Sequence, residues 1–380
     1  MPTQMLRNRA EAEDLIRGLT FLGTGGGGRP EAGRNFLYTL VDRGATPGWT
    51  DITELPNDAW ACTVFSMGTT APRPADFKEG QEWPAYGTRE PASAMRRAIR
   101  ELEVYSGKRV SAVFALELGG SNTPGPLNAA ATLGIQFVDG DGSGRAVPEA
   151  GQCVPALQGL PMCPASICDD WGNVLVMKNI KSLEIAEAIG KNISVITKIP
   201  DPYAFCAIAA YLMPVAQLKQ SIVLGTVSRA FALGQAIRLA REAGKDALAE
   251  TAECVHGRIL FQGVVGKREW ESKGGYQIGT TDITGTGAWA GHAFRIWFKN
   301  EHHISWLDGA PFVSSPDLIA VVETATAEPV TNTYLSEGMA VTVIGAPGEP
   351  AFRAPAGISI LGPRHFGFDI EYRPFETMFQ

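Results

Sequence analysis

The chain has 380 residues, of which 45% are hydrophobic and 19% charged, and it carries a formal net charge of −7 at pH 7. This length leaves room for two domains, and the composition excludes a disordered or fibrous protein. Because nucleic acids and other polyanions bind to basic surfaces, the acidic balance argues against such partners. The 43 glycines make up about 11% of the chain, compared with the usual frequency of about 7%, and many of them lie in a few loops.

The sequence also indicates the cellular compartment of the protein. Its first residues contain no apolar stretch of the kind that forms a signal peptide. The longest apolar run, at 206–216, is too short to cross a bilayer and contains Pro214. The six cysteines include no Cys-x-x-Cys pair and are too few for a disulfide framework. We therefore expect a cytoplasmic protein that binds no membrane.

The first part of the chain predicts an α/β domain over residues 1–250. Apolar runs predict buried strands at 61–67, 110–116 and 135–138, and helical patterns lie at 9–18, 30–42, 91–105 and 126–133. Since this alternation is typical of parallel strands joined by helices, we expect a largely parallel sheet. Residues 180–250 are predicted to be a helical extension, in which 227–243 presents small residues suited to close helix packing.

The pattern changes between residues 245 and 257. Short alternating runs follow, separated by glycine, proline, aspartate or asparagine, among them RILFQG, YQIGTTDI, HAFRIWF and AVTVIG. Regularly spaced short strands of this kind are typical of sandwiches and barrels. We therefore predict a β-rich domain, barrel-like or sandwich-like, over residues 251–380.

Two polar loops follow neighbouring predicted strands. The first carries Glu117 and Asn122, and the second carries Asp139, Asp141, Arg145 and Glu149. The carboxyl ends of parallel strands meet at one edge of a sheet, where ligands bind. Crowded carboxylates raise one another's pKa, so that one serves as an acid and another as a base. The predicted catalytic residues are Asp139, Asp141, Glu149 and Glu117. A solvated turn whose aspartates cap local amides is the structural alternative.

The same loop offers oxygen ligands for a divalent metal ion, with Asp139, Asp141 and Glu149 as candidates. Its first positions resemble an EF-hand loop, but Ala150 stands where the bidentate glutamate is needed. An EF-hand is therefore excluded, and a looser metal site stays open.

A cluster of glycines at 23–28 contains the pattern G-x-G-x-x-G. No strand is predicted before it and no Gly-Lys-Ser/Thr follows, so neither a dinucleotide fingerprint nor a Walker loop is indicated. Bare amides before a helix can still bind a carboxylate or a developing anion. We therefore predict that Gly25, Gly26, Gly27 and Gly28 bind substrate, with a purely structural turn as the alternative. On the first interpretation, Gly27→Val should damage ligand binding more than stability.

In the second half, Asn300 and Glu301 are followed by His302 and His303. This polar stretch suits either the rim of a site or an exposed turn. None of the five histidines has the spacing of a zinc site. No Gly-x-Ser-x-Gly elbow occurs, which disfavours a serine hydrolase.

Several blocks together resemble the S-methyl thiohydantoin desulfurase-like family, a former domain of unknown function associated with hydantoinases and oxoprolinases. The matching blocks are LGTGGGGRP at 22–30, LELGGSN at 116–122, VDGDGSGRAVPE at 138–149, FKNE at 298–301, PDLI at 316–319 and LGPRHFGFD at 361–369. The resemblance implies an N-terminal α/β domain, a C-terminal β-rich domain, and removal of methanethiol from a five-membered cyclic amidine by water. It adds Asn300 and Glu301 to the predicted substrate-binding residues Gly25–Gly28, Asn122 and Arg145.

The sequence thus predicts a hydrolase that acts on a small heterocyclic substrate. The alternative is a non-catalytic accessory or ligand-binding subunit that works with a hydantoinase or oxoprolinase. We expect the protein to be a homo-oligomer that needs no cofactor beyond the metal ion left open above.

Overall fold

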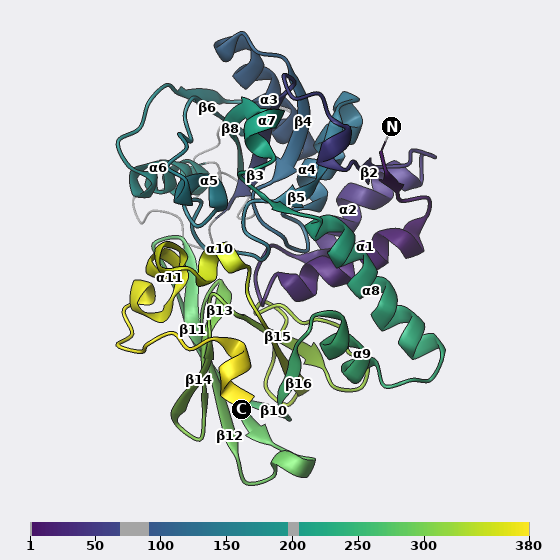
Figure 1. Ribbon diagram of the computed structural model, residues 1–380, viewed down its shortest axis with the longest axis vertical. Helices are drawn as coiled ribbons and strands as arrows, with labels where there is room; N and C mark the ends of the chain where they lie inside the picture. The colour runs from purple at the N-terminus through teal and green to yellow at the C-terminus, as the bar shows by residue number, and fades with distance from the viewer. Residues whose placement is uncertain (1, 69–90, 197–204, 380) are drawn as a thin grey trace, which may run out of the picture.

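Two seven-stranded β-sheets, one above the other, organise the protein (Figure 1). The computed structural model describes residues 2–68, 91–196 and 205–379. The upper sheet draws its strands from residues 60–224 and is covered by helices on both faces, and the lower sheet draws its strands from residues 258–346. The predicted α/β part followed by a β-rich part is confirmed.

The upper sheet has parallel strands at its centre and antiparallel strands around them. β3 (Trp60–Met67), β4 (Val110–Ala115) and β5 (Gln136–Asp141) are parallel neighbours, as the three apolar runs predict. The other strands are β6 (Ala165–Asp169), β7 (Val174–Met177), β8 (Cys206–Pro214) and β9 (Val223–Leu224), and the order across the sheet is β7-β6-β8-β3-β4-β5-β9. β8 comprises most of the apolar run at 206–216 and is inserted antiparallel between β6 and β3, so the predicted helical extension over 180–250 is wrong at this strand.

Alternate residues of these strands face two separate cores. Val113 and Ala115 of β4 belong to one apolar cluster, and Ala112 and Phe114 belong to another on the opposite face. Side chains alternate between the faces of a strand, so a sheet with continuous apolar runs must be covered on both sides. The helices of this part are α1 (Arg9–Leu22), α2 (Pro30–Val41), α3 (Pro91–Ser106), α4 (Pro124–Leu133), α5 (Val154–Leu157), α6 (Leu183–Ile196), α7 (Val215–Leu218), α8 (Thr226–Glu242) and α9 (Ala247–Cys254). Two short strands, β1 (Gln4–Met5) and β2 (Gly48–Trp49), pair beside the 3₁₀ helix η1 (Ile52–Glu54).

The closest helix packing joins α1 to α8, which lie against each other at the right of Figure 1. A Cβ atom at Gly18 would come within 1.7 Å of the Ala230 carbonyl oxygen, and one at Gly234 within 1.7 Å of the Asp14 carbonyl oxygen. The two backbones meet because neither glycine has a side chain. The small-residue stripe predicted for 227–243 has this function. The pair also buries Asp14, which binds the Arg238 guanidinium at 2.8 Å.

The lower sheet is entirely antiparallel. Its strands are β10 (Arg258–Lys273), β11 (Tyr276–Gly285), β12 (Ala293–Lys299), β13 (Glu301–Leu307), β14 (Ala310–Ser314), β15 (Leu318–Glu323) and β16 (Ala340–Ala346), in the order β14-β13-β12-β11-β10-β16-β15. It curls until β13 and β14 approach β15 from the other end, which makes a half-barrel around Phe261, Phe294 and Val343. The remaining elements are η2 (Gly287–Trp289), α10 (Pro350–Arg353), α11 (Pro355–Leu361), η3 (Pro363–Phe366) and η4 (Phe375–Phe379).

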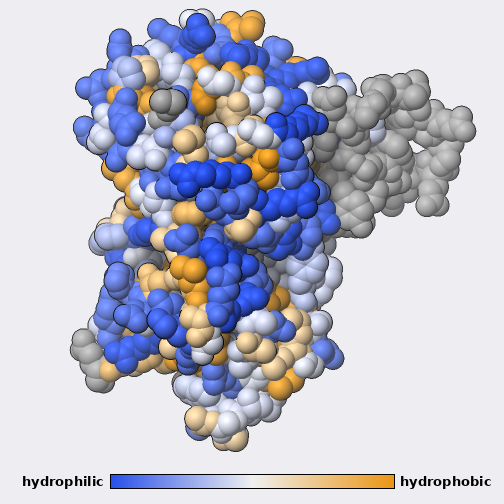
Figure 2. All heavy atoms as spheres, turned by 90° about the vertical axis from the view of Figure 1, so that its right-hand side faces the viewer, coloured by the Kyte–Doolittle hydropathy of each residue, from blue (hydrophilic) through white to orange (hydrophobic). Residues whose placement is uncertain are grey.

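The surface that carries α8 and α9 is mainly hydrophilic, with hydrophobic residues in small separate groups (Figure 2). Among the described residues, no helix combines the length and the apolar character needed to span a bilayer.

Candidate functional site

The glycine loop and the lower sheet meet at Glu301. The Gly27 N–H donates to Glu301 Oε1 at 3.2 Å, and a Cβ atom at Gly26 would lie only 1.9 Å from the same oxygen. Glu301 is the first residue of β13, after a tight hairpin turn in which Asn300 has a φ of 60°. The loop between α1 and α2 therefore holds a carboxyl group from the other half of the molecule.

On the other side of the glycine loop lies Glu117, which follows β4. Its Oε1 accepts a hydrogen bond from Asn122 Nδ2 at 2.5 Å, and its Oε2 accepts one from the Val147 N–H at 2.6 Å. A Cβ atom at Gly27 would lie 2.5 Å from the Gly119 Cα atom, so this loop also packs directly on the glycine loop. The glycines thus let two carboxyl-bearing segments approach one another.

The two carboxyl groups share one electrostatic environment. Both side chains are buried, with exposed fractions of 9% for Glu117 and 3% for Glu301. Burial raises the pKa of both carboxyls, and the negative charge of Glu117 raises the pKa of Glu301 further. Glu301 Oε2 is buried without a hydrogen-bond partner among the described residues. An oxygen of this kind is a costly feature unless it is protonated and can donate to a ligand. Near neutral pH we therefore assign the proton to Glu301 and the charge to Glu117, whose oxygens both accept hydrogen bonds.

Arg145, predicted to bind substrate, lies buried between the two halves and binds protein atoms. Its guanidinium donates to the carbonyl oxygens of Ala146, Pro316, Asp317 and His302 and to Thr24 Oγ1, at distances of 2.9–3.3 Å. Five donors with five protein acceptors leave no N–H for a ligand. The sequence could not show this because the acceptors are mainly backbone atoms far along the chain. Arg145 ties the glycine loop to the strand that carries Glu301.

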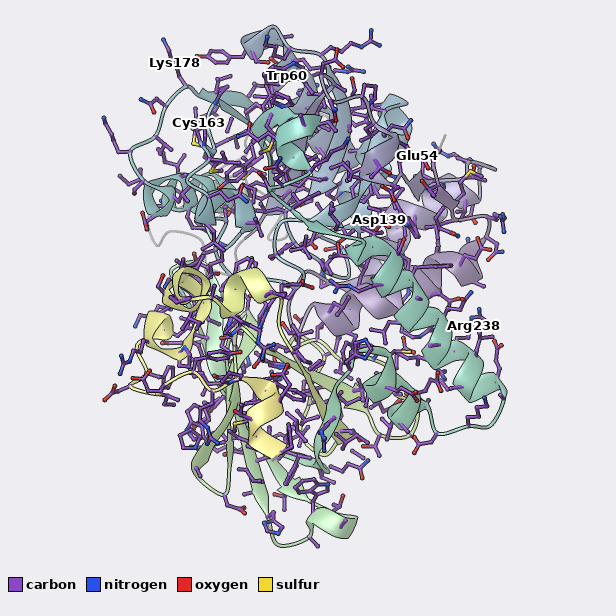
Figure 3. The ribbon with its side chains drawn as sticks, viewed as in Figure 1. Glu54, Trp60, Asp139, Cys163, Lys178 and Arg238 are labelled. Atoms are coloured by element: carbon purple, nitrogen blue, oxygen red, sulfur yellow. The ribbon has the colours of Figure 1, made fainter. Side chains whose placement is uncertain are left out.

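The two aspartates of the acidic loop have local roles. Asp139 caps α8: its Oδ1 accepts from the backbone N–H groups of Val227 and Ser228, and its Oδ2 from Ser228 Oγ. Figure 3 shows Asp139 beside the start of this helix. Asp141 Oδ2 accepts from the backbone N–H groups of Ser143 and Gly144, and burial raises its pKa to about 7. Asp139 and Asp141 therefore both cap backbone N–H groups, as the alternative expects, but Asp141 is fully buried and the turn is not solvated. Asp141 also lies near enough to Glu117 for its charge to raise the pKa of that carboxyl, so the predicted convergence holds for these two residues.

Glu149 is ionised and paired. It binds Lys299 Nζ at 2.5 Å and His365 Nε2 at 3.1 Å. Burial alone would raise its pKa, but the hydrogen bonds from His365 and Lys299 lower it to about 2. Such a group is a weak base at neutral pH. The part of the chain that the structure describes contains no group of three histidine, cysteine or acidic residues so placed that it could hold a metal ion.

Lys299 belongs to a polar cluster, with Tyr276, Lys191 and Glu187, that the sequence analysis did not predict. Two ammonium groups lie near the Tyr276 ring, with Lys299 Nζ 4.1 Å and Lys191 Nζ 4.6 Å from its centroid, and the Tyr276 hydroxyl donates to Glu187 at 3.1 Å. Burial is the main cause that raises the pKa of Tyr276, and the negative charges of Glu187, Glu149 and Glu301 raise it further, so this cluster lies near the carboxyl pair. Lys299 lies within the block FKNE, but nothing in the sequence indicates that Tyr276 and Lys191 meet it.

The exposed turn proposed for Glu301–His303 is wrong. The turn is confined to Asn300, and His302 and His303 are buried strand residues of β13. His302 contacts the Ile319 carbonyl oxygen and Asn332 Oδ1, and the His303 ring packs 4.0 Å from that of Phe366, measured between centroids. Asn300 also has a structural contact, since its Oδ1 accepts from the N–H of Gln277 on the neighbouring strand β11. From the sequence alone, polar residues are expected to be exposed. Here they are buried because the two halves of the molecule pack together, which the sequence does not show.

Comparison with known proteins decides the family. The model of the S-Me-THD-like N-terminal domain matches residues 10–179, and that of the S-Me-THD-like C-terminal domain matches residues 185–375. The chain belongs to the S-Me-THD-like family. A crystal structure of a protein from Chromobacterium violaceum has the same fold, with a TM-score of 0.75 and 22% sequence identity over 98% of this chain and 100% of that one. A comparison with curated proteins finds no match.

The S-Me-THD-like sequence blocks meet in space at this site. Gly27 comes from the first block, Gly119 from the second and Glu301 from the FKNE block, and their contacts form the junction described above. The C-terminal family model begins at residue 185 and so includes β8, which lies inside the upper sheet. Segments of both S-Me-THD-like models therefore build the sheet that positions Glu117.

Proposed function

We propose that this protein is a hydrolase of a small cyclic amidine or amide, such as an S-methyl thiohydantoin or a related hydantoin or imide ring. One observation carries the proposal: two buried carboxyl groups, Glu117 and Glu301, flank the same glycine loop, and burial raises the pKa of both. A carboxylate and a carboxylic acid in one buried environment near neutral pH supply a base for water and an acid for the ring nitrogen. The family supports this ring as substrate.

On an S-methyl thiohydantoin the reaction runs in two stages. Glu117 takes a proton from water as the oxygen bonds to the ring carbon that carries sulfur, and Glu301 gives its proton to the adjacent ring nitrogen. The carbon–sulfur bond then breaks while the new hydroxyl group returns a proton to Glu301. Protonated Glu117 gives its proton to the departing methanethiolate. The products are hydantoin and methanethiol, and both carboxyl groups regain their starting states.

The test is turnover by the purified protein without any partner. Methanethiol is measured with a thiol reagent and hydantoin by chromatography. Glu117→Gln and Glu301→Gln should each lower kcat by about 10²–10⁴, the usual contribution of an acid or base group. Glu271→Gln, at an exposed position of β10, is the matched control and should keep the parent rate.

Two results would contradict the proposal. One is near-parental turnover in both folded variants. The other is saturable binding of the thiohydantoin with no turnover by the parent, which is what an accessory subunit of a hydantoinase or oxoprolinase would give.

A further inference from the structure

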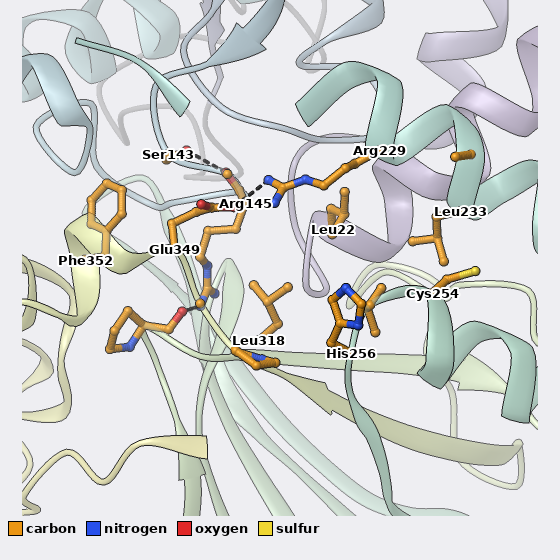
Figure 4. A pocket seen from close by; sticks show the side chains of 16 residues that line it. Leu22, Ser143, Arg145, Arg229, Leu233, Cys254, His256, Leu318, Glu349 and Phe352 are labelled. Carbon is orange, nitrogen blue, oxygen red and sulfur yellow. Dashed lines mark hydrogen bonds and ion pairs between the residues drawn. The ribbon is translucent and has the colours of Figure 1, made fainter. Parts of the chain in front are cut away.

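A cavity lined by residues of both halves of the molecule includes neither carboxyl group of the pair described above. Its volume is about 310 Å³. Its walls come from the end of α1, the turn at 143–145, α8, the residues after α9, and the segment that enters β15. Figure 4 shows Leu22, Leu233, Leu318 and His256 around this space, with Glu349 and Phe352 on its other side.

The cavity and the junction at Glu301 share one residue, Arg145. Arg145 contributes to the cavity wall, while its guanidinium donates to Thr24 Oγ1 and to the His302 carbonyl oxygen, which flank the junction at Glu301. Neither Glu117 nor Glu301 lines the cavity. A molecule bound here would touch both halves of the protein without reaching the reacting groups.

The lining determines the chemistry of the occupant. Aliphatic and aromatic side chains dominate it, from Leu22, Leu233, Val255, Leu318 and Phe352. The two oppositely charged side chains at its edge are paired, because Arg229 Nη2 binds Glu349 Oε1 at 2.5 Å. The third charge, that of Arg145, is fully hydrogen-bonded to protein atoms. None of these three groups offers an unpaired charge to the space, so a charged ligand would lose its hydration without gaining a counter-ion from Arg145, Arg229 or Glu349.

The volume of the cavity determines the size of the ligand that it can hold. An apolar cavity of about 150 Å³ holds one benzene molecule. The cavity here has about twice that volume, which suits a molecule of two fused rings. A few polar groups at the edge of an apolar pocket are the usual arrangement of a small-molecule site.

We propose that this cavity is a second small-molecule site, which binds a neutral, mainly apolar molecule of about the size of a bicyclic aromatic. The site is independent of the hydrolase proposed above, because its lining includes neither Glu117 nor Glu301. Binding here contacts α8 and the 143–145 turn on one side and the segments around β15 on the other, and so favours the joined arrangement of the two halves.

Indole is the probe for the test, with indole-3-acetate as its charged counterpart, and binding is measured by isothermal titration calorimetry. Ala232 lines the cavity from an exposed position of α8, so Ala232→Trp fills the space without entering a core. Leu239→Trp, at an exposed position of the same helix outside the cavity, is the matched control. Indole should saturate the parent and Leu239→Trp, and Ala232→Trp should weaken its binding at least tenfold. Indole-3-acetate should bind the parent at least fivefold more weakly than indole.

The proposal fails if indole does not saturate the folded parent or binds Ala232→Trp as tightly. Stronger binding of indole-3-acetate would overturn the neutral class of ligand. Displacement of indole by an S-methyl thiohydantoin would make this cavity the substrate site and overturn its status as a second site. None of these measurements requires turnover, so failure of the proposed hydrolase activity leaves their outcome readable.

Discussion

The Gly27 N–H donates to Glu301 Oε1 at 3.2 Å across 274 positions of sequence, and this contact joins the α/β part of the chain to the half-barrel. It brings a carboxyl group of the lower sheet to the edge of the upper sheet, where Glu117 follows a parallel strand. The candidate site therefore exists only when the two halves are docked. Substitutions that disturb the docking should affect activity and stability together.

Gly27 itself gives the first prediction. Its φ is +73°, and a Cβ atom there would come within 2.5 Å of the Gly119 Cα atom. Gly44 also has a positive φ, of +78°, but an added Cβ atom would meet nothing within 4 Å. Gly44→Ala should cost about 1 kcal/mol for the left-handed backbone alone. Gly27→Ala should cost at least about 2 kcal/mol more, because the backbone of a neighbouring loop has to move.

Urea unfolding of the two variants measures this difference. Equal losses of stability would show that the loop at 27 has room, and would restore the expectation that Gly27 mainly serves a ligand. The structure favours the structural role, because the space in front of each of Gly25–Gly28 is already filled by protein atoms.

The second prediction concerns stability against pH at Glu301. Burial raises the pKa of this carboxyl in the folded protein, whereas the unfolded chain ionises near pH 4.5. The stability associated with the protonated group is therefore fully present at low pH and is lost as pH rises toward the folded pKa. Glu301→Gln cannot ionise. Relative to the parent, its free energy of unfolding should rise by at least about 1 kcal/mol between pH 5 and pH 8, since one pKa unit corresponds to about 1.4 kcal/mol.

Urea titrations of parent and variant at pH 5, 6, 7 and 8 test this. A constant difference across the series would mean that Glu301 ionises at its ordinary pKa, and the assignment of the acid role would then be wrong. The loss of turnover predicted for the same variant is measured separately.

The third prediction concerns Glu149, whose contribution to stability changes with pH in the opposite direction to that of Glu301. Hydrogen bonds from His365 and Lys299 hold the pKa of Glu149 at about 2. The stability that comes from this ionised group is present above the unfolded pKa, near 4.5, and is lost as pH falls toward 2. Thermal unfolding of Glu149→Gln should show its largest deficit relative to the parent at pH 5–7, and the deficit should shrink at pH 4 and pH 3. Glu271→Gln, which is exposed, should show no such dependence.

Local patterns predicted the parallel core because each strand carries its own signal. The runs at 61–67 and 110–116 are apolar throughout, as a strand buried on both faces requires, and helical periodicity separates them. The run at 206–216 was equally apolar, but it fell within the predicted helical extension at 180–250, because a short apolar run alone does not distinguish a buried strand from a buried helix. Its antiparallel insertion beside β3 follows from the tertiary fold.

The sequence predicted which residues belong to the candidate site better than it predicted how those residues contact one another. Glu117, Glu301 and the glycines were all selected from the sequence, because clustered glycines indicate that something approaches the backbone closely. The sequence does not show that Glu301 is what approaches Gly26. Asp139 carries the same chemical signal as Glu117, and its capping of α8 depends on a helix that begins 87 positions after it (226 minus 139).

The last prediction concerns Arg145, whose hydrogen bonds connect the glycine loop to the strand that carries Glu301. Its guanidinium joins Thr24 of the glycine loop to the carbonyl oxygen of His302, the residue after Glu301. Lysine keeps the positive charge but has three donors on one nitrogen, so it cannot reach acceptors on opposite sides as the planar fork does. Arg145→Lys should leave buried carbonyl groups without a donor, at about 1–3 kcal/mol each, and should lower kcat by loosening the contact between Gly27 and Glu301. Arg364→Lys, at an exposed arginine of η3, is the control and should change neither quantity. Urea unfolding and turnover are measured on both variants. If Arg145→Lys keeps the parental stability and rate, charge alone suffices at this position, and the hydrogen-bonded fork is not what holds the two halves together.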